Sequence, residues 1–176
     1  MKRREVEMLW KPGKIELLAP ARDLRSARAA IDCGADAVYM GGPRFGNSVA
    51  DIAAVAEYAR RFGVRVYVTL NTLLFDDELA DAERIARQVV EAGADALIVQ
   101  DMAYLEMELE GVELHASTQT FNASPEKAAF LADCGFSRVI LERNLSLEEI
   151  RRIRAATDVE LECFVHGAIC VFYSGR

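Results

Sequence analysis

The chain has 176 residues, of which 52% are hydrophobic, and a formal net charge of −7 at pH 7. This length is enough for one domain with a substantial core, and the negative charge argues against non-specific nucleic-acid binding through overall charge. No run of apolar residues approaches the ~18–20 that cross a membrane, and no apolar signal core follows the basic N-terminus, so we expect a cytoplasmic protein without membrane contact.

In chain order, residues 1–13 are expected to form an N-terminal leader and residues 14–176 a single domain. Within that domain, short apolar segments alternate with amphipathic segments that mostly end at a glycine, a residue that tolerates the left-handed conformation of a helix end. The predicted strands are residues 15–19, 37–40, 64–70, 96–100, 112–116, 138–141 and 160–166. The predicted helices are residues 24–33, 49–62, 77–92, a short piece between 102 and 110, residues 125–134 and a segment that Ser146 caps.

Seven strands that alternate with six helices indicate a parallel sheet with helical crossovers. Three features favour a barrel over an open doubly wound sheet. The first strand is not followed by a Gly-x-Gly-x-x-Gly motif, polar residues recur on one face of the strands, and the sequence stops one unit short of eight. We therefore predict an α/β fold, a (β/α)8 TIM-type barrel that is incomplete and truncated before its last unit.

The strand pattern also predicts an unusually polar barrel interior. If the apolar set of each strand faces the helices, the alternate set points inward. That inward set is Glu16, Leu18, Arg65, Tyr67, Thr69, Asn71, Glu113, His115, Ser117, Arg138, Ile140, Glu142, Glu160, Glu162, Phe164 and His166. Because unpaired buried charges are costly, we predict that Arg65 and Arg138 neutralise some of the inward glutamates Glu16, Glu113, Glu160 and Glu162.

Candidate site residues follow from the place where barrel enzymes build their sites, the carboxyl ends of the strands. The polar residues at these ends are Asn71, Gln100, Asp101, His115, Ser117, Gln119, Arg143 and His166. Both histidines of the chain are in this set, and imidazole changes charge near neutral pH. Cys170 follows the last strand, where a cytosolic thiol is more often metal-binding or reactive than disulfide-bonded. Neither a Gly-x-Ser-x-Gly nor a His-Glu-x-x-His motif is present.

The segment 164–176, Phe-Val-His-Gly-Ala-Ile-Cys-Val-Phe-Tyr-Ser-Gly-Arg, resembles the signature of the collagenase-like peptidase family, class U number thirty-two. Further blocks match in order. They are Glu-Leu-Leu-Ala-Pro-Ala at 16–21, Gly-Ala-Asp-Ala-Val-Tyr at 34–39, Val-Tyr-Val-Thr-Leu-Asn-Thr at 66–72, Gly-Ala-Asp-Ala-Leu-Ile-Val-Gln-Asp at 93–101 and His-Ala-Ser-Thr-Gln-Thr at 115–120. The resemblance runs from about residue 15 to residue 176 and implies a barrel fold as well.

The resemblance implies an activity. The family was named for collagen degradation, and other members resemble oxygen-independent hydroxylases of ribosomal RNA bases, transfer RNA bases or the ubiquinone ring, with an iron–sulfur cluster. The expectation is an iron–sulfur-dependent hydroxylase of an RNA base, with RNA as partner. Cys170 would be the first ligand of a 4Fe-4S cluster whose other cysteines lie beyond residue 176. His166 and Arg143 would position substrate or move protons, and the expected substrate-binding residues are Asn71, Gln100, Ser117 and Gln119.

Two alternatives stay open. One is a peptidase acting on a peptide substrate, in which Asp101, His115 or His166 assists attack on an amide. The other is a non-catalytic binding domain whose chemistry requires a further part of the protein. In either case an incomplete barrel would leave sheet edges and apolar surface open, so self-association of the fragment is expected.

Overall fold

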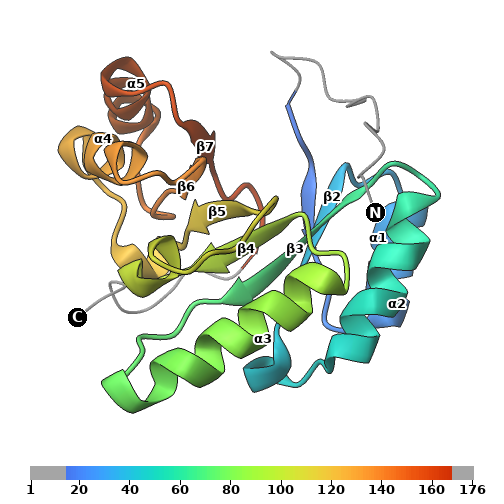
Figure 1. The fold of residues 1–176 in the computed structure, drawn as a ribbon. Coiled ribbons are helices and arrows are strands. Elements are labelled where there is room, and N and C mark those ends of the chain that lie inside the picture. Colours follow the sequence, from blue (N-terminus) through green and yellow to red (C-terminus); the bar gives the residue numbers. More distant parts are fainter. Residues whose placement is uncertain (1–14, 168–176) are drawn as a thin grey trace.

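The computed structural model describes residues 15–167 (Figure 1). The predicted leader, residues 1–13, and Cys170 lie outside the described residues. Within them, seven β-strands alternate with α-helices. In chain order the elements are β1 (Leu18–Pro20), α1 (Leu24–Asp32), β2 (Ala37–Gly41), α2 (Val49–Arg60), β3 (Arg65–Leu70), α3 (Leu79–Glu91), β4 (Ala96–Val99), β5 (Glu113–Ala116), α4 (Pro125–Asp133), β6 (Arg138–Ile140), α5 (Leu147–Ala156) and β7 (Glu160–Glu162).

The strands form one parallel sheet whose spatial order follows the sequence from β1 to β7. The sheet curls into most of a barrel, with the helices on its outer side (Figure 1). The curvature is large enough that Arg138 Nη1, on β6, lies 2.6 Å from Glu16 Oε1, just before β1. The predicted incomplete (β/α) barrel is therefore confirmed, as a curled sheet whose first and sixth strands are linked across the interior.

The two faces of the strands differ as the alternation predicts. The outward set packs with the helices in one large core, which includes Val66, Val68, Leu97, Val99 and Val139. The inward set forms a smaller apolar cluster of Ala37, Tyr67, Ala96, Ile98 and Ile140 inside the barrel. Burial of the larger set against the helices supplies the main drive for folding, because apolar burial stabilises in proportion to the area removed from water.

The helices are fewer than predicted, with five α-helices within residues 15–167. The short helical piece predicted between residues 102 and 110 is present as a 3-10 helix, Met102–Leu105, and does not form a sixth α-helix. The physical reason is its pattern. Glu106, Glu108 and Glu110 alternate with apolar residues, a period of two that gives a helix no apolar face. By contrast, the capping box predicted at Ser146 is confirmed, with Glu149 as its second member.

Two strands are shorter than predicted by more than one residue. β1 begins at Leu18 instead of residue 15, and β7 ends at Glu162 instead of residue 166. Both are end strands of the sheet within the described residues, where pairing on one side is missing. Ile15 and Leu17 beside β1 are accordingly exposed, which is consistent with the self-association that stays a prediction. No helix within residues 15–167 has the length and apolar character that a membrane span requires.

Substitution of Gly93 by alanine tests how closely α3's end packs on α2. Gly93 has φ +109°, and an added Cβ would lie 3.0 Å from the Ala56 side chain. We expect Gly93→Ala to lower the free energy of unfolding by about 2–3 kcal/mol, from the positive φ and the crowding together. The matched control is Gly34→Ala, where φ is +96° but nothing lies within 4 Å, and about 1–2 kcal/mol is expected. Equal losses in urea unfolding would show that the crowding contributes nothing.

Candidate functional site

A pocket of about 290 Å³ lies at the carboxyl ends of the strands, on the inner side of the sheet. This is the position at which barrel enzymes place their chemistry. Four residues predicted from the sequence line it, namely Asn71, Ser117, Gln119 and Arg143. The remaining lining residues are Tyr39, Thr69, Ile98, Thr118, Ile140, Glu162 and Phe164.

Arg143 and Phe164 form a stacked pair in the wall of this pocket. The guanidinium carbon of Arg143 lies 3.7 Å from the centroid of the Phe164 ring. Arg143 follows β6 and Phe164 follows β7, so the two side chains meet because these strands are paired neighbours in the sheet. A cation over a ring face is attracted by the quadrupole of the ring, and the pair presents a flat, positively charged surface of the kind that binds planar rings.

Hydrogen bonds fix the wall formed by β3 and β5. The Asn71 side-chain amide donates to Ser117 Oγ at 3.3 Å, and the same oxygen accepts from the Gln119 backbone N–H at 3.2 Å. Ser117 is therefore buried and engaged as the cap of the 3-10 helix Thr118–Thr120. Gln100 lies beside this wall and donates to the Gln119 carbonyl at 3.4 Å. These hydrogen bonds hold Asn71, Gln100 and Gln119 in place. The Ser117 hydroxyl is used to cap the 3-10 helix, which is a structural role.

Glu162 is a carboxylate in the pocket lining that the sequence-based choice of site residues omitted. Its side chain is 16% exposed and lies 3.5 Å from Arg138 Nη1. Burial, together with the nearby carboxylate of Glu16, raises the pKa of Glu162 to about 7, although the Arg138 charge opposes the rise. The strand alternation predicts that Glu162 points inward from β7. Glu162 lies two residues before Phe164 on the same face, so the sequence could have identified it as a site residue.

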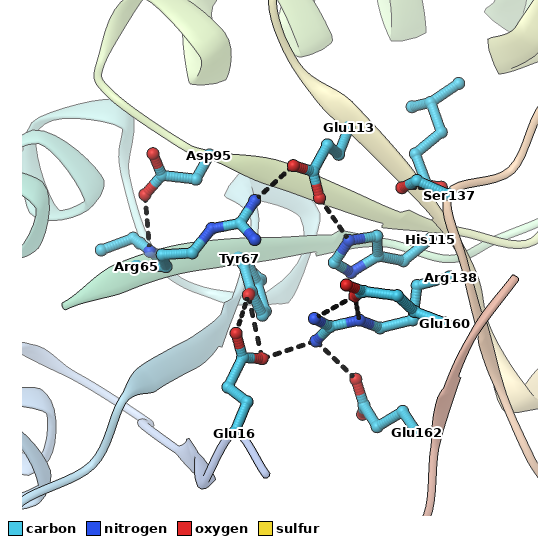
Figure 2. Close-up of polar contacts among 12 residues, drawn as sticks. Glu16, Arg65, Tyr67, Asp95, Glu113, His115, Ser137, Arg138, Glu160 and Glu162 are labelled. Atoms are coloured by element: carbon cyan, nitrogen blue, oxygen red, sulfur yellow. Dashed lines mark hydrogen bonds and ion pairs between the residues drawn. The ribbon is translucent and has the colours of Figure 1, made fainter. Parts of the chain in front are cut away.

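The interior below the pocket contains the ion pairs predicted from the sequence (Figure 2). Arg138 binds Glu16 at 2.6 Å and Glu160 at 2.7 Å, and Arg65 binds Glu113 at 2.8 Å. The prediction that Arg65 and Arg138 neutralise inward glutamates is thus confirmed. These pairs offset the cost of placing charges inside the barrel.

Tyr67 joins the two parts of this interior network. Its hydroxyl donates to both carboxylate oxygens of Glu16, at 2.9 and 3.0 Å, and its ring lies edge-on to His115 with centroids 4.9 Å apart. Burial raises the pKa of Tyr67 well above its ordinary value. The phenol therefore stays protonated and keeps donating to Glu16.

His115 belongs to this interior network and does not line the pocket. It is fully buried, and Nε2 lies 3.3 Å from Glu113 Oε2. Burial lowers the pKa of His115 below its ordinary value, while the hydrogen bond from His115 and the charge of Arg65 lower the pKa of Glu113 to about 2. Its Nδ1 has no hydrogen-bond partner within residues 15–167, so neither ring nitrogen contacts a serine or cysteine that it could activate.

Three further predicted residues lie elsewhere. Asp101 accepts hydrogen bonds from the backbone N–H groups of Leu74 and Ala103, both at 2.9 Å, so both of its oxygens hold loops together. His166 is exposed in a bend beyond β7 and is absent from the pocket lining. Cys170 lies outside the described residues, and within residues 15–167 no group of three metal-ligating side chains comes together.

A larger hollow of about 530 Å³ lies between α4, α5 and the starts of β6 and β7. It is lined by residues such as Ala129, Phe136 and Thr157. This is the amino-terminal end of the strands, which in barrels serves stability. The smaller pocket at the carboxyl ends is therefore the better candidate for chemistry.

Comparison with known proteins places this geometry in context. A family model described as Peptidase family U32 matches residues 22–176. The chain is 52% identical over 169 residues to the 23S rRNA 5-hydroxycytidine C2501 synthase of Escherichia coli, covering 93% of this chain and 26% of that protein. It is 35% identical to the tRNA hydroxylation protein P1 of Bacillus subtilis, covering 93% and 41%, and 32% identical to a collagenase of Porphyromonas gingivalis, covering 92% and 44%.

The chain thus spans between about a quarter and less than half of the length of these relatives. Among solved structures, the U32 peptidase Mk0906 superposes with a TM-score of 0.70 at 18% identity, covering 88% of this chain and 70% of that one. An oxaloacetate acetylhydrolase superposes with a TM-score of 0.63, also at 18% identity, covering 83% and 65%. At this identity the structural likeness establishes the fold alone.

Proposed function

The chain belongs to peptidase family U32, and from this premise we propose that it is the barrel part of an enzyme that hydroxylates a base in RNA. The observation that carries the proposal is the pocket at the carboxyl ends of the strands, with the Arg143–Phe164 stack in its wall. Proteins that bind single bases in RNA stack them on aromatic rings or guanidinium planes and hydrogen-bond their edges. The similarity to an rRNA 5-hydroxycytidine synthase and to tRNA hydroxylation proteins supports the same substrate class.

The size of the pocket supports a base over a peptide. Its volume of about 290 Å³ is at the lower limit of ligand pockets, which suits one planar ring. Asn71 and Gln119 supply amide groups for the ring edge, and Ile98 and Ile140 supply apolar surface. Peptide hydrolysis would require an activated nucleophile or a bound metal. Within residues 15–167, His115 pairs with Glu113 and not with a serine or cysteine, and no three metal-ligating side chains come together.

The experiment that tests this proposal is nucleoside analysis of RNA from cells with and without the gene. Loss of one hydroxylated nucleoside on deletion, and its return with the wild-type gene, is expected. Unchanged rRNA and tRNA nucleosides, combined with cleavage of gelatin by the purified full-length protein, would instead establish the peptidase. Unchanged nucleosides without cleavage would leave a binding domain.

We also propose that Cys170 is one ligand of an iron–sulfur cluster, as the resemblance to the family implies. The described residues do not by themselves form a site for such a group, because they contain no cluster of three ligating side chains. The remaining ligands must come from other parts of the full protein.

Removal of the Cys170 thiol is expected to abolish cluster binding. In the full-length protein purified without oxygen, we expect matched amounts of iron and acid-labile sulfide, and a loss of at least about 90% of both in Cys170→Ala, because thiolates hold such clusters. Cys134→Ala is the matched control, since Cys134 lies at the end of α4 away from the pocket. Equal iron content in the two variants would contradict the assignment.

A further inference from the structure

One guanidinium in the barrel interior serves three carboxylates (Figure 2). Arg138 contacts Glu16 at 2.6 Å, Glu160 at 2.7 Å and Glu162 at 3.5 Å. Two of the carboxylates take short, strong contacts with the guanidinium, and Glu162 has the longest of the three. Glu162 is also the one that lines the pocket. A single positive charge cannot neutralise three negative charges, and Glu160 is 41% exposed whereas Glu162 is 16% exposed, so the pocket carboxyl is the weakly compensated member of the set.

Resting on the proposed function, we infer that Glu162 is the residue that holds the ring edge of a single pyrimidine base, and that it does so in its protonated, neutral form. A protonated carboxyl presents one O–H donor beside one carbonyl acceptor. Cytosine offers the complementary pair, an acceptor at N3 beside the N4 amino donor. Uracil offers the reverse pair, the N3–H donor beside the O4 acceptor, which the same carboxyl matches when its two oxygens exchange roles.

The ionised form cannot make this contact. A carboxylate has acceptors only, so one of its oxygens would face the lone pair of cytosine N3 or of uracil O4. One attractive contact would then be offset by one repulsion. The neutral carboxyl makes two hydrogen bonds to the same edge, and the Arg143–Phe164 stack supplies a flat surface for the face of the ring.

The charged and titratable groups around Glu162 decide which form is present. Arg138 from β6 favours the carboxylate, whereas Glu16 before β1 favours the neutral form. Arg143 from the loop after β6 lines the same pocket, and Glu160 lies two residues away on β7, where it pairs with Arg138. Tyr39 from β2 is uncharged, because burial and then the Glu162 charge raise its pKa. Burial acts most strongly and favours the neutral form, in agreement with the pKa of about 7 for Glu162.

The glutamine substitution separates this role from the alternatives, because its amide is a permanent donor–acceptor pair of nearly the same shape. The measurement is binding of cytidine and of uridine to the purified full-length protein by calorimetry at about pH 6 and about pH 8, a range in which neither nucleoside titrates and the Glu162 charge changes. We expect wild-type binding to weaken about tenfold at the higher pH. Glu162→Gln should bind at both pH values within about threefold of wild type at the lower pH, and Glu162→Ala should bind weakly at both.

Glu160→Gln is the matched control, with the same change on the same strand and the same guanidinium, outside the pocket lining. It frees Arg138 for Glu162, which lowers the pKa of Glu162. Binding should therefore be intact at about pH 6, and as the pH is raised it should be lost at a lower pH than in wild type. Thermal unfolding verifies that each variant is folded.

The outcomes discriminate between this inference and the function on which it rests. Binding that is independent of pH in the wild type, and equal in Glu162→Ala, overturns the role of Glu162 and leaves base binding intact. Binding that Glu162→Gln abolishes at both pH values also overturns it, because a charged carboxylate would then be required. Absence of nucleoside binding by folded wild-type protein at both pH values overturns base binding, and the inference with it.

Discussion

Arg138→Met is expected to lower the free energy of unfolding by about 3–5 kcal/mol at pH 7, because it leaves buried carboxylates without their cation. Arg138 is 7% exposed in its side chain and contacts Glu16, Glu160 and Glu162. It also lies over the Tyr67 ring, 5.2 Å from the centroid. Methionine is long enough to fill much of the same space, so the lost charge dominates over lost packing.

The matched control for this prediction is Arg65→Met, the same change at the other interior arginine. Within the part of the chain that the structure describes, Arg65 pairs with one glutamate, Glu113, and the two side chains are 27% and 42% exposed. Water screens such a pair, and about 1 kcal/mol or less is expected. Urea unfolding of the two variants measures the difference, and equal losses would show that the three-carboxylate cluster is not a special contributor to stability.

The stability of Arg138→Met should also depend on pH in a definite direction. The folded-state pKa of Glu162, about 7, is raised above its ordinary value of 4.5. A group with a raised folded-state pKa contributes stability that is complete below the unfolded-state value and is lost as the pH rises through the folded-state value. Without Arg138 the pKa of Glu162 rises further, so the loss extends to higher pH. The variant should therefore be closest to wild type near pH 4.5 and furthest from it above about pH 7.

The faces of the barrel could be predicted from the sequence because a strand has a fixed period of two. Val66 and Val68 alternate with Arg65 and Tyr67, and burying the valines against helices leaves no choice about where the other two point. Opposite charges on the inferred inner faces then had to pair. The structure adds which charge meets which. Arg138 rather than Arg65 collects three glutamates, a result of sheet curvature that no local pattern contains.

The candidate site was less predictable, because the position of a residue along a strand does not say whether its side chain reaches the pocket, is buried below it or lies outside it. His115 stands near the carboxyl end of β5, yet its ring is fully buried beside Tyr67. His166 was expected at the end of a longer β7 and instead lies exposed beyond it. Asp101 follows β4 as a catalytic acid would, but its short side chain bonds to nearby backbone instead, a common competing role for aspartate.

The stacked pair in the pocket wall was missed for a different reason. Arg143 was selected for its charge, and Phe164 was regarded only as an inward side chain of a strand. Their contact depends on the two segments that leave β6 and β7, whose paths are set by the pairing of those strands. Tyr39 could have been found from the sequence, since it lies two residues after Ala37 in β2 and therefore shares its inward face.

On the proposed function, Arg143→Ala is expected to reduce kcat/KM for hydroxylation of an RNA base by about 30- to 5000-fold. The guanidinium lies 3.7 Å from the Phe164 ring centroid, so its removal takes away both a charged planar surface for the base and the side chain that holds Phe164 in place. Stacking of a base contributes about 1–3 kcal/mol and a desolvated cation–π contact about 1–2 kcal/mol. Together these correspond to the expected loss in transition-state stabilisation.

Two further variants show whether shape or charge is responsible. Arg143→Lys keeps the positive charge but loses the plane, so we expect at least about a tenfold loss if stacking matters. Arg151→Ala removes an exposed arginine of α5 whose ion pair within residues 15–167 is with Glu148 at 3.9 Å, and we expect activity within about twofold of wild type. Complementation of a deletion strain, with the hydroxylated nucleoside quantified by mass spectrometry, measures all three. If Arg143→Lys restores full activity, the arginine acts as a point charge toward the RNA, and the stacked geometry of the pocket wall is not what binds the base.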